Sequence, residues 1–340
     1  MLNEQQQEAV NLALSGHNIY LCGRAGTGKS YTIKELHKHL TDRGKVVAIT
    51  CTTGIACSNF DNACTLHRWS GIHDGRYRSD EVIKLNSLNE AALDRIRTTD
   101  VLIVDEISML SQRLFDQLVA VVTALRRDND EFLCGLQLIV CGDFNQLAPV
   151  PNRRFSDNGD FCFLSPNFRK LHKITLTEVV RQTDPVLIRS IEKVSEGGKI
   201  DEETITYMKN LTRPLKGQEE TTKLFATNDL VNSYNRTRIE RQPGALMEYV
   251  SNDCGDGKYL NELTAPKRLW LKEKCPVVLI RNLSDKLYNG LQGFVTGFDA
   301  KGPMVYFPAL KSTSTIGKVT FSGNISIIFI DGIYYTYLLF

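Results

Sequence analysis

Apolar and polar positions follow two recurring patterns along the first half of the chain. Short apolar runs bounded by polar residues or glycine predict buried strands, and they occur at residues 17–23, 45–50, 100–106 and 136–143. Apolar residues three or four positions apart predict a helix at residues 3–15, and a second helix follows Ser30. Strands that alternate with helices are typical of a mostly parallel sheet with helices on both faces, so we expect an α/β fold.

The pattern is interrupted at residues 155–168, which are polar and contain glycine. We interpret this run as a domain boundary and expect a first domain at residues 1–165. Beyond it, the predicted elements are helices at residues 184–196 and 229–241, a strand at residues 222–228 and a strand-rich region from about residue 246. We therefore expect a second domain at residues 166–310, with a small β-rich insertion, and a divergent tail at residues 311–340.

A glycine-rich turn joins the first predicted strand to the helix that follows it. Its sequence, "GRAGTGKS" at residues 23–30, matches the Walker A pattern in full, and the flanking strand and helix favour a phosphate-binding loop over an ordinary turn. Glycines let backbone N–H groups face phosphates at a helix N-terminus, where the helix dipole also favours anions. Lys29 is then expected to reach the β- and γ-phosphates, and Ser30 to hold Mg²⁺. The residues expected to bind the nucleotide in this loop are Gly23, Gly26, Thr27, Gly28, Lys29 and Ser30.

Two adjacent acids end the third predicted strand, in "LIVDEISML" at residues 102–110. Ligands of α/β sheets bind at the carboxyl ends of the strands. Asp105 is therefore expected to hold the metal through Ser30 and water, and Glu106 to orient or deprotonate the attacking water. A strand that simply ends in solvated acids is the alternative, but beside a Walker A loop this pair predicts a nucleotide hydrolase.

The fourth predicted strand ends in "VCGDFNQLAPVP" at residues 140–151. Its carboxyl end is expected to place Asp143 and Gln146 at the same edge of the sheet as Asp105. A glutamine at that edge can sense the γ-phosphate and transmit its presence or loss. We therefore include Gln146 among the catalytic residues.

These motifs, in this order, resemble superfamily 1 helicases and, within them, the petite integration frequency (Pif) family of DNA helicases. The resemblance rests on "GHNIYLCGRAGTGKS", "TTGIA…TLHRWSGI", "VLIVDEISML", "LIVCGDFNQLAPVP", "LTEVVRQ" and "LYNGLQGFVTGF", and it extends over residues 2–310. It implies two RecA-like domains that close on ATP, the second of them incomplete here, and a small inserted subdomain at residues 71–98 that helps to split the duplex. The implied activity is that of an ATP-dependent 5′-to-3′ DNA helicase, with ATP and Mg²⁺ as cofactors and single-stranded and forked DNA as partners. The resemblance also implies roles in DNA repair, recombination and telomere maintenance, a location in the nucleus or mitochondrion, and a monomer without a membrane partner.

The resemblance assigns roles to single residues near the nucleotide. Gln6 in "LNEQQQ" matches the glutamine that reads the adenine edge, and Arg181 in "VVRQ" resembles the arginine that reaches the γ-phosphate from the second RecA-like domain. An arginine suits that role because its fork and permanent charge can follow charge that develops on phosphoryl oxygens. A surface ion pair with Glu178 is the alternative for Arg181.

The stretch at residues 52–72 lies where Pif-type helicases line the groove for single-stranded DNA. The residues expected to contact DNA are Thr53, Gly54, His67 and Trp69, with Thr227 and Asn228 in "LFATNDLVNSYN" farther along the chain. Thr53 and Gly54 offer hydroxyl and backbone donors to phosphates, whereas the rings of His67 and Trp69 can contact or stack on bases. Core packing is the alternative for both rings. For Trp69, core packing and contact with bases are equally supported by the sequence.

Three cysteines and a histidine also fall within residues 51–67. Cys64 and His67 have the C-x-x-H spacing of half a zinc site, but a second pair at ligand spacing is absent, so we expect no metal there. Nine cysteines without paired spacing, behind a start that does not resemble a secretory or transit peptide, favour reduced thiols inside a cell. The net charge is only +2, so a nucleic acid would have to be held by a local groove.

The chain departs from the Pif pattern towards its end. An "HKSQG"-like motif and an "ALSRA"-like motif with a second γ-phosphate arginine are expected and do not occur. The run "ISIIFIDGIYYTYLLF" (325–340) has Asp331 as its only charge and no period that continues the family pattern, so we expect a truncated or mis-spliced product after Asn324. Two alternatives to a working helicase stay open: a relic that binds ATP or single-stranded DNA without productive unwinding, and a P-loop ATPase that acts as a protein switch. The stretch from Thr53 to Trp69 counts against the switch.

Overall fold

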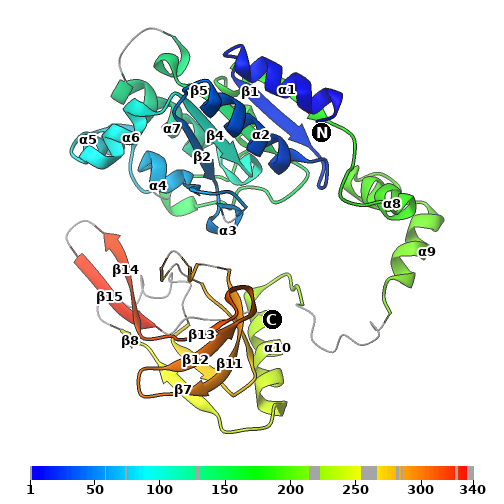
Figure 1. The fold of residues 1–340 in the computed structure, drawn as a ribbon, viewed down its shortest axis with the longest axis vertical. Coiled ribbons are helices and arrows are strands. Elements are labelled where there is room, and N and C mark those ends of the chain that lie inside the picture. The colour runs from blue at the N-terminus through cyan, green and yellow to red at the C-terminus, as the bar shows by residue number, and fades with distance from the viewer. Residues whose placement is uncertain are drawn as a thin grey trace. The chain divides into compact units, whose positions relative to one another are not determined.

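The structure, a computed structural model, describes residues 2–57, 59–72, 75–126, 131–213, 223–253, 266–280, 283–284, 286–288, 290–325 and 328–334. The chain forms two compact units, Met1–Arg213 and Pro214–Phe340 (Figure 1). The domain boundary expected after residue 165 falls within the first unit. Within the described ranges, no helix is long and apolar enough to cross a membrane.

A six-stranded parallel sheet is the centre of the first unit (Figure 1). Its strands are β1 (Ile19–Gly23), β2 (Val47–Cys51), β3 (Cys64–Thr65), β4 (Val101–Asp105), β5 (Gln137–Gly142) and β6 (His172–Leu176), in the spatial order β3-β2-β4-β5-β1-β6. Every neighbouring pair in this sheet is parallel. The four strands predicted from apolar runs are confirmed as β1, β2, β4 and β5, and the predicted α/β class is confirmed with them.

Strand β6, at the edge of this sheet, has no continuous apolar run. Ile174 and Leu176 are buried, whereas the alternate residues Lys173 and Thr175 are exposed, and this period of two is typical of a half-buried strand. β6 pairs with β1 along its full length. This pairing extends the first sheet past residue 165, where the domain boundary was expected.

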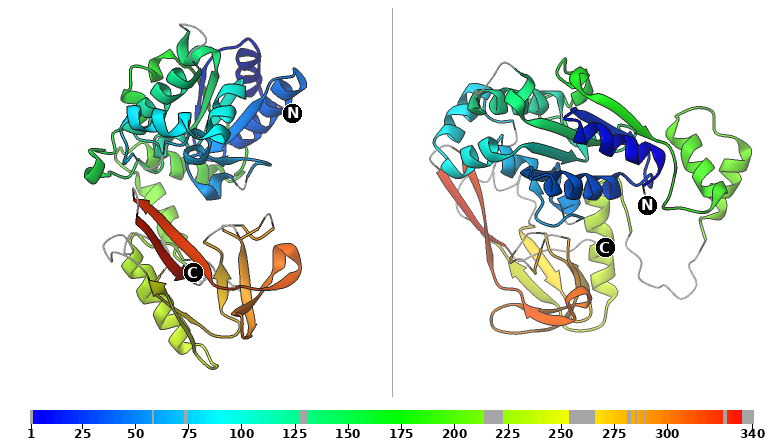
Figure 2. Two further views of the ribbon diagram at one scale, coloured as in Figure 1. Left: turned by 90° about the vertical axis from the view of Figure 1, so that its left-hand side faces the viewer. Right: turned by 45° about the horizontal axis from the view of Figure 1, so that its top comes forward.

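Helices cover both faces of the sheet (Figures 1 and 2). The helices of this unit are α1 (Glu4–Leu14), α2 (Lys29–Asp42), α3 (Gly54–Cys57), α4 (Leu66–Ser70), α5 (Ser79–Ser87), α6 (Glu90–Thr98), α7 (Gln112–Arg126), α8 (Pro185–Ser195) and α9 (Glu202–Asn210). α1 and α2 pack on the face of β1 that carries Ile19 and Leu21, whereas α4 to α7 pack on the face that carries Tyr20. The sheet therefore separates two apolar cores.

The segment expected as a small inserted subdomain, residues 71–98, belongs to the first unit. It forms α5 and α6, and Val82 and Ile96 from these helices are fully buried in the core that they share with α7. The helices thus depend on the main core for their burial. A role for this segment in splitting a duplex stays a prediction.

The second unit is built from antiparallel strands and, in its described residues, one α-helix. Its elements are α10 (Asn228–Arg241), β7 (Met247–Val250), β8 (Asn252–Asp253), β9 (Arg268–Leu271), β10 (Pro276–Val278), β11 (Gln292–Phe298), β12 (Pro303–Phe307), β13 (Ser312–Thr315), β14 (Val319–Ile325) and β15 (Ile328–Tyr334). They form sheets with the strand orders β10-β11-β12-β13, β14-β15-β8 and β7-β9. Leu271, Val295 and Phe307 lie in the apolar core of this unit. The predicted helix at residues 229–241 and the strand-rich region after it are confirmed.

One predicted strand of the second unit does not form. Residues 223–227, expected within the strand at 222–228, are exposed and make no ladder with any described strand, and residue 222 lies outside the described residues. A strand needs a neighbour that satisfies its backbone groups, and an apolar pattern alone does not supply one. The tail at residues 311–340, by contrast, contains β13, β14 and β15, and β15 pairs with both β14 and β8.

Candidate nucleotide site and DNA-contact surface

The glycine-rich loop runs from the end of β1 to the first turn of α2. Gly28 caps the helix in the left-handed conformation, with φ of +85°, and Lys29 begins the helix. Nζ of Lys29 donates hydrogen bonds to the carbonyl oxygens of Gly23 (2.7 Å) and Arg24 (3.0 Å). The ammonium group therefore spans the loop, beside the backbone that is expected to surround the phosphates.

Two glycines of this loop have positive φ and no room for a side chain. A Cβ at Gly28 would lie 2.5 Å from Nε2 of Gln6, and a Cβ at Gly26 (φ +84°) would lie 2.7 Å from Oε1 of Gln182. Both distances are shorter than real Cβ contacts. These positions require glycine both for the left-handed backbone and for the close approach of neighbouring side chains.

Gln6 lies against the loop from α1. Its backbone N–H donates to Oδ1 of Asn3 (2.9 Å) and its Oε1 accepts from the Asn3 N–H (3.1 Å), which is a capping box that begins the helix. Nε2 of Gln6 donates to the carbonyl oxygen of Thr27 at 3.3 Å, and the residue is only 3% exposed. Gln6 thus supports the backbone of the loop, while its role in reading an adenine edge stays a prediction.

Asp105 ends β4 in a buried position and is 3% exposed. Its Oδ1 accepts a hydrogen bond from the Glu106 N–H at 2.9 Å. Burial raises the pKa of the Asp105 carboxyl to about 6; the Glu106 carboxylate adds to this rise and the Lys29 ammonium opposes it. Asp105 therefore interacts electrostatically with the lysine of the glycine-rich loop.

Glu106 adopts a left-handed backbone conformation, with φ of +58°, which is uncommon for a residue that has a side chain. Thr52 supports this turn from β2's end: its Oγ1 donates to the Glu106 carbonyl at 2.9 Å and its N–H donates to the Asp105 carbonyl at 3.2 Å. The turn leads into a 3₁₀ helix, η1 (Ile107–Met109). Backbone strain is thus located at the residue expected to orient the attacking water, and such strain often lies at functional sites.

Strand β5 lies between β1 and β4, so its carboxyl end falls between the glycine-rich loop and Asp105. Asp143 follows this strand end, and its Oδ1 accepts from the Asn145 N–H at 3.0 Å. Its Oδ2 accepts from Nε2 of Gln146 at 3.1 Å, and Gln146 is exposed. The sheet order therefore brings the ends of three strands, far apart in the sequence, to one edge.

A magnesium ion bound together with a nucleotide would find oxygen ligands at this edge. Ser30, in the first turn of α2, offers a hydroxyl and Asp105 offers a carboxylate, and Mg²⁺ prefers oxygen ligands. The raised pKa of Asp105 supports the fit, because a nearby cation would offset the cost of burying its charge. The part of the chain that the structure describes contains no group of three or more His, Cys, Asp or Glu side chains able to hold a metal ion. A cation at this edge would therefore need phosphate and water oxygens as further ligands.

The segment that follows β6 crosses the glycine-rich loop. The N–H groups of Val180 (2.8 Å) and Arg181 (3.2 Å) both donate to the carbonyl oxygen of Gly26. Arg181 therefore belongs to the first unit, which corrects the expectation that it reaches the nucleotide from a second domain; the pairing of β6 with β1 brings this segment to the loop. Glu178, the alternative ion-pair partner, accepts a hydrogen bond from Nδ2 of Asn3 at 2.9 Å.

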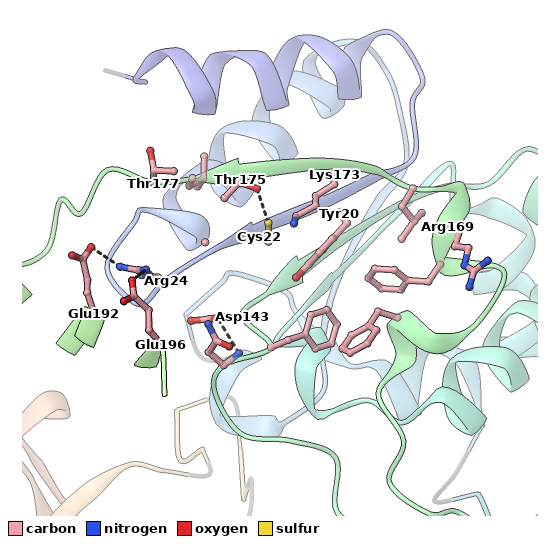
Figure 3. Close-up of a pocket in the computed structure, with 17 residues that line it drawn as sticks. Tyr20, Cys22, Arg24, Asp143, Arg169, Lys173, Thr175, Thr177, Glu192 and Glu196 are labelled. Atoms are coloured by element: carbon pink, nitrogen blue, oxygen red, sulfur yellow. Dashed lines mark hydrogen bonds and ion pairs between the residues drawn. The ribbon is translucent and has the colours of Figure 1, made fainter. Parts of the chain in front are cut away.

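A pocket of about 900 Å³ opens beside the loop, on the sheet face that carries Tyr20 (Figure 3). The residues that line it include Tyr20, Cys22 and Arg24 on the β1 side, Asp143 and Phe144 after β5, Lys173 and Thr175 of β6, Glu192 of α8, and Glu196, which follows the end of α8. At its rim, Arg24 forms ion pairs with Glu192 (2.5 Å) and Glu196 (3.2 Å). These pairs connect the glycine-rich loop to α8 and the residue after it, and no local sequence pattern relates these two segments.

The expected DNA-contact stretch begins directly after β2. Thr53 caps the short helix α3, since its Oγ1 accepts a hydrogen bond from the Ala56 N–H at 3.3 Å. Gly54 begins α3 and is exposed. Because the Thr53 hydroxyl accepts in this cap, its own proton stays available as a donor to a phosphate.

Helix α4 carries the two rings that are expected to meet bases. Trp69 is 2% exposed and lies in the core cluster with Phe115 and Leu118. The core-packing alternative is therefore the one observed for Trp69, and the stacking role is corrected. His67 is partly exposed, because residues two positions apart on a helix lie on different sides of it.

Thr227 and Asn228 belong to the second unit. Thr227 caps α10, with its Oγ1 accepting from the Leu230 N–H at 3.5 Å, and Asn228 begins that helix. Both residues are exposed. Their contact with DNA stays a prediction.

Eight of the cysteines lie in described residues and are unpaired. Cys51, the last residue of β2, is fully buried, whereas Cys57 and Cys64 are partly exposed. The Cys57 thiol donates a hydrogen bond to the Thr53 carbonyl oxygen at 3.3 Å. No spacing rule for metal ligands predicts that Cys51 lies inside the apolar cluster on the α1 and α2 side of the sheet and that Cys57 packs against this cluster.

The sequence matches a known family over much of its length. Residues 1–196 match the family model described as PIF1-like helicase. The chain is 36% identical over 321 residues to "ATP-dependent DNA helicase PIF1" of Emericella nidulans, covering 89% of this chain and 42% of that protein. It is 34% identical over 322 residues to the Homo sapiens protein of the same name, covering 90% of this chain and 48% of that protein. The chain thus spans less than half the length of these curated relatives.

Solved structures show the same fold. The crystal structure of Pif1 helicase from Candida albicans matches with a TM-score of 0.87 and 30% identity, covering 100% of this chain and 84% of that chain. The crystal structure of Bacteroides Pif1 bound to ssDNA matches with a TM-score of 0.79 and 22% identity, covering 100% of this chain and 81% of that chain. At the lower identity the likeness establishes a common fold.

Proposed function

This chain belongs to the PIF1-like helicase family, and we propose that it hydrolyses ATP in order to move along single-stranded DNA and separate duplex strands. Its relatives carry the name ATP-dependent DNA helicase and are more than twice as long as the matched part. The proposal extends the named activity to this shorter chain.

One observation carries the proposal: β1, β5 and β4 are adjacent in the sheet. Their carboxyl ends hold Lys29 of the glycine-rich loop, Gln146 and Asp105 at a single edge. Lysine, glutamine and carboxylate at neighbouring strand ends are the groups that phosphoryl transfer to water requires for binding, sensing and metal coordination.

Each residue at this edge has a proposed task. Lys29 binds the β- and γ-phosphates, and Ser30 with Asp105 would hold the magnesium ion. Bound ATP with Mg²⁺ supplies the phosphoryl group that is transferred. Glu106 orients the attacking water or accepts its proton, and Gln146 senses the γ-phosphate.

Arg181 is proposed to stabilise charge on the γ-phosphate from within the first unit. Its backbone is hydrogen-bonded to the carbonyl oxygen of Gly26, so the origin of its side chain is fixed relative to the loop. A guanidinium group on this anchored backbone can reach towards developing phosphoryl charge without movement of the main chain.

DNA is proposed to bind along the stretch after β2. The Thr53 hydroxyl and the Gly54 N–H would contact phosphates, and the His67 ring would contact bases, while Trp69 supports the helix from the core. Thr227 and Asn228 would add contacts from the second unit. The proposed 5′-to-3′ direction rests on the family resemblance alone. Forked DNA is the proposed substrate because one solved structure of Pif1 helicases concerns DNA unwinding at forked dsDNA by two coordinating helicases.

The test is steady-state ATP hydrolysis by this chain, with and without single-stranded DNA. Lys29→Ala should abolish turnover, because the loop loses the charge that binds the phosphates. Lys38→Ala is the matched control: it removes an exposed lysine from the same helix, away from the loop, and should leave turnover unchanged.

Three outcomes separate the proposed function from its alternatives. Turnover that DNA stimulates and Lys29→Ala abolishes supports the motor, and strand separation on a forked duplex then tests unwinding. ATP binding without turnover would favour a relic that binds but does not unwind. Turnover that DNA does not affect would favour an ATPase that acts as a protein switch.

A further inference from the structure

Thr52 lies between the nucleotide edge and the stretch proposed to contact DNA. It follows Cys51, the last residue of β2, and precedes Thr53, which caps α3. Its N–H donates to the Asp105 carbonyl oxygen at 3.2 Å, which continues the contact of β2 with β4 by one residue. Its Oγ1 donates to the Glu106 carbonyl oxygen at 2.9 Å. Thr52 therefore holds the residue proposed to orient the attacking water and is joined by a peptide bond to a proposed DNA contact.

The turn at Glu106 is held from two sides. Its carbonyl oxygen accepts from the Met109 N–H (3.2 Å) as well as from Thr52, and its φ is left-handed at +58°. On the β5 side the packing is tight, since a Cβ at Gly142 would lie 3.0 Å from Cγ2 and 3.1 Å from the backbone nitrogen of Ile107. On the β2 side the support is a side chain, the Thr52 hydroxyl. A backbone conformation of this kind persists only where its surroundings hold it, so loss of the hydroxyl should loosen the turn.

A second threonine of β2 makes the same kind of bond away from the turn. Thr50 is fully buried, and its Oγ1 donates to the Ile103 carbonyl oxygen at 2.8 Å. Ile103 lies in the middle of β4, where it pairs with Ile49. Its carbonyl has no proposed role in binding ATP or DNA. Thr50 therefore joins the same two strands as Thr52 without reaching the nucleotide edge.

We propose that Thr52 is a positioning residue that couples single-stranded DNA to ATP hydrolysis by setting the backbone of Glu106. The inference rests on the proposed function and adds the route by which DNA acts on the nucleotide edge. A DNA phosphate bound by the Thr53 hydroxyl and the Gly54 N–H restrains the backbone that leads back to Thr52. The Thr52 hydroxyl passes this restraint to the Glu106 carbonyl, and the Glu106 carboxylate is then held towards the attacking water.

The effect is expected on turnover rather than on binding. Thr52 bonds to the carbonyl oxygens of Asp105 and Glu106, and neither oxygen has a proposed role in holding the nucleotide. A reacting group displaced by about 1 Å can lose about a hundredfold in rate. One lost hydrogen bond permits only part of such a displacement. We therefore expect Thr52→Val to lower the DNA-saturated kcat about tenfold.

The test is steady-state ATP hydrolysis, measured without DNA and with a saturating single-stranded oligonucleotide. Thr52→Val removes the hydroxyl and keeps the branched shape, Thr52→Ser restores the hydroxyl, and Thr50→Val is the matched control. Thr52→Val should lower kcat much more with DNA than without it, and should leave the KM for ATP and the Kd for the oligonucleotide nearly unchanged. Thr52→Ser and Thr50→Val should keep the stimulation of the unmodified chain. Urea denaturation checks that each variant is folded.

Hydrogen exchange gives a readout that does not depend on turnover. The Met109 N–H donates to the Glu106 carbonyl oxygen at 3.2 Å, and the Leu110 N–H donates to that of Ile107 at 3.0 Å. Single-stranded DNA added without ATP should slow exchange of these two amides in the unmodified chain, because the turn is then restrained. Thr52→Val should remove this slowing. Slowing that persists in Thr52→Val would show that DNA reaches the turn by another route, and would overturn the proposal.

The hydrolysis results decide the proposal in the same way. DNA stimulation that falls in Thr52→Val and returns in Thr52→Ser supports it. Equal stimulation in Thr52→Val and the unmodified chain overturns it, and so does a loss of the same size with and without DNA. An equal loss in Thr50→Val also overturns it, because any loosening between β2 and β4 would then lower turnover. An unmodified chain that DNA does not stimulate would count against the proposed function itself, and the coupling would fall with it.

Discussion

The two ends of one sheet edge hold their motif residues in different ways. At the nucleotide end, backbone geometry positions the residues: Gly28 has a left-handed φ, Lys29 bonds to the loop carbonyls, and Asp105 accepts from the next backbone N–H. At the end proposed to contact DNA, which we call the DNA end, Thr53 caps a short helix and Trp69 is buried in the core. These two residues belong to the stretch expected to contact DNA, but they stabilise the fold.

The difference shows which motif residues can be assigned from a pattern. A phosphate-binding loop needs glycines with positive φ and a lysine at one spacing, and few other structures need that combination. A threonine before a short helix or a tryptophan on a helix is common in ordinary packing. A DNA-contact motif therefore mixes ligand-binding residues with residues that hold their neighbours in place.

The largest effect is expected at Trp69. Trp69→Ala should lower the free energy of unfolding by about 3–5 kcal/mol, because it leaves a large cavity in the core on the α7 side of the sheet. Trp69→Phe should cost less, since the indole N–H has no hydrogen-bond partner among the described residues. Urea denaturation measures both. Weaker DNA binding by Trp69→Ala at an unchanged free energy of unfolding would restore the stacking role and remove the contrast between the two ends.

Asp105→Asn should stabilise the nucleotide-free chain while it abolishes hydrolysis. The pKa of the carboxyl rises from 3.8 to about 6 on folding, and at about 1.4 kcal/mol per pH unit the buried charge costs about 3 kcal/mol. Below about pH 4 the carboxyl is protonated in both states, so the variant gains nothing there. As the pH rises through the folded pKa, the unmodified chain loses this stability and the neutral asparagine does not.

The measurement for Asp105→Asn is thermal or urea unfolding of both chains across this pH range, without nucleotide or divalent cations. The difference in unfolding free energy should grow between about pH 4 and about pH 7 and then level off. An equal difference at every pH would mean that the carboxyl does not titrate in this range. The nucleotide end would then be less buried than its geometry indicates.

A smaller effect is expected at His67. His67→Ala should weaken binding of single-stranded DNA by about 1 kcal/mol, roughly fivefold, because one ring contact to a base is lost. ATP binding without DNA should not change, since α4 packs against β2, β3, α6 and α7. His39→Ala, on the exposed side of α2, is the matched control. Equal DNA affinity in both variants would leave the DNA end without an identified base contact.

The smallest effect is expected at Arg24. Its ion pairs with Glu192 and Glu196 are partly exposed, so Arg24→Ala should weaken ATP binding by less than about 1 kcal/mol. A double-mutant cycle with Glu192→Gln measures the coupling, which should fall as salt is added. A coupling that is large and independent of salt would show that α8 controls the loop more strongly than an exposed ion pair can.

Much of the first sheet could be predicted because its central strands are buried on both faces. Such strands have nearly continuous apolar runs, and β1, β2, β4 and β5 were found in this way. β6 was not predicted because exposed and buried residues alternate along this edge strand. β3 was not predicted because it contains only Cys64 and Thr65. The strand predicted around residues 223–227 does not form, since an apolar pattern cannot supply a partner for its backbone.

The amino-acid sequence alone specifies the glycine-rich loop, the acids after β4 and the glutamine after β5, because covalent spacing and local backbone conformation are enough to form them. It does not specify which distant segments meet. The hydrogen bond from the Arg181 N–H to the Gly26 carbonyl oxygen and the burial of Trp69 both depend on the sheet order and on how helices pack against the sheet. Contacts of this kind are set by the burial of apolar surface over the whole unit, which no local pattern records.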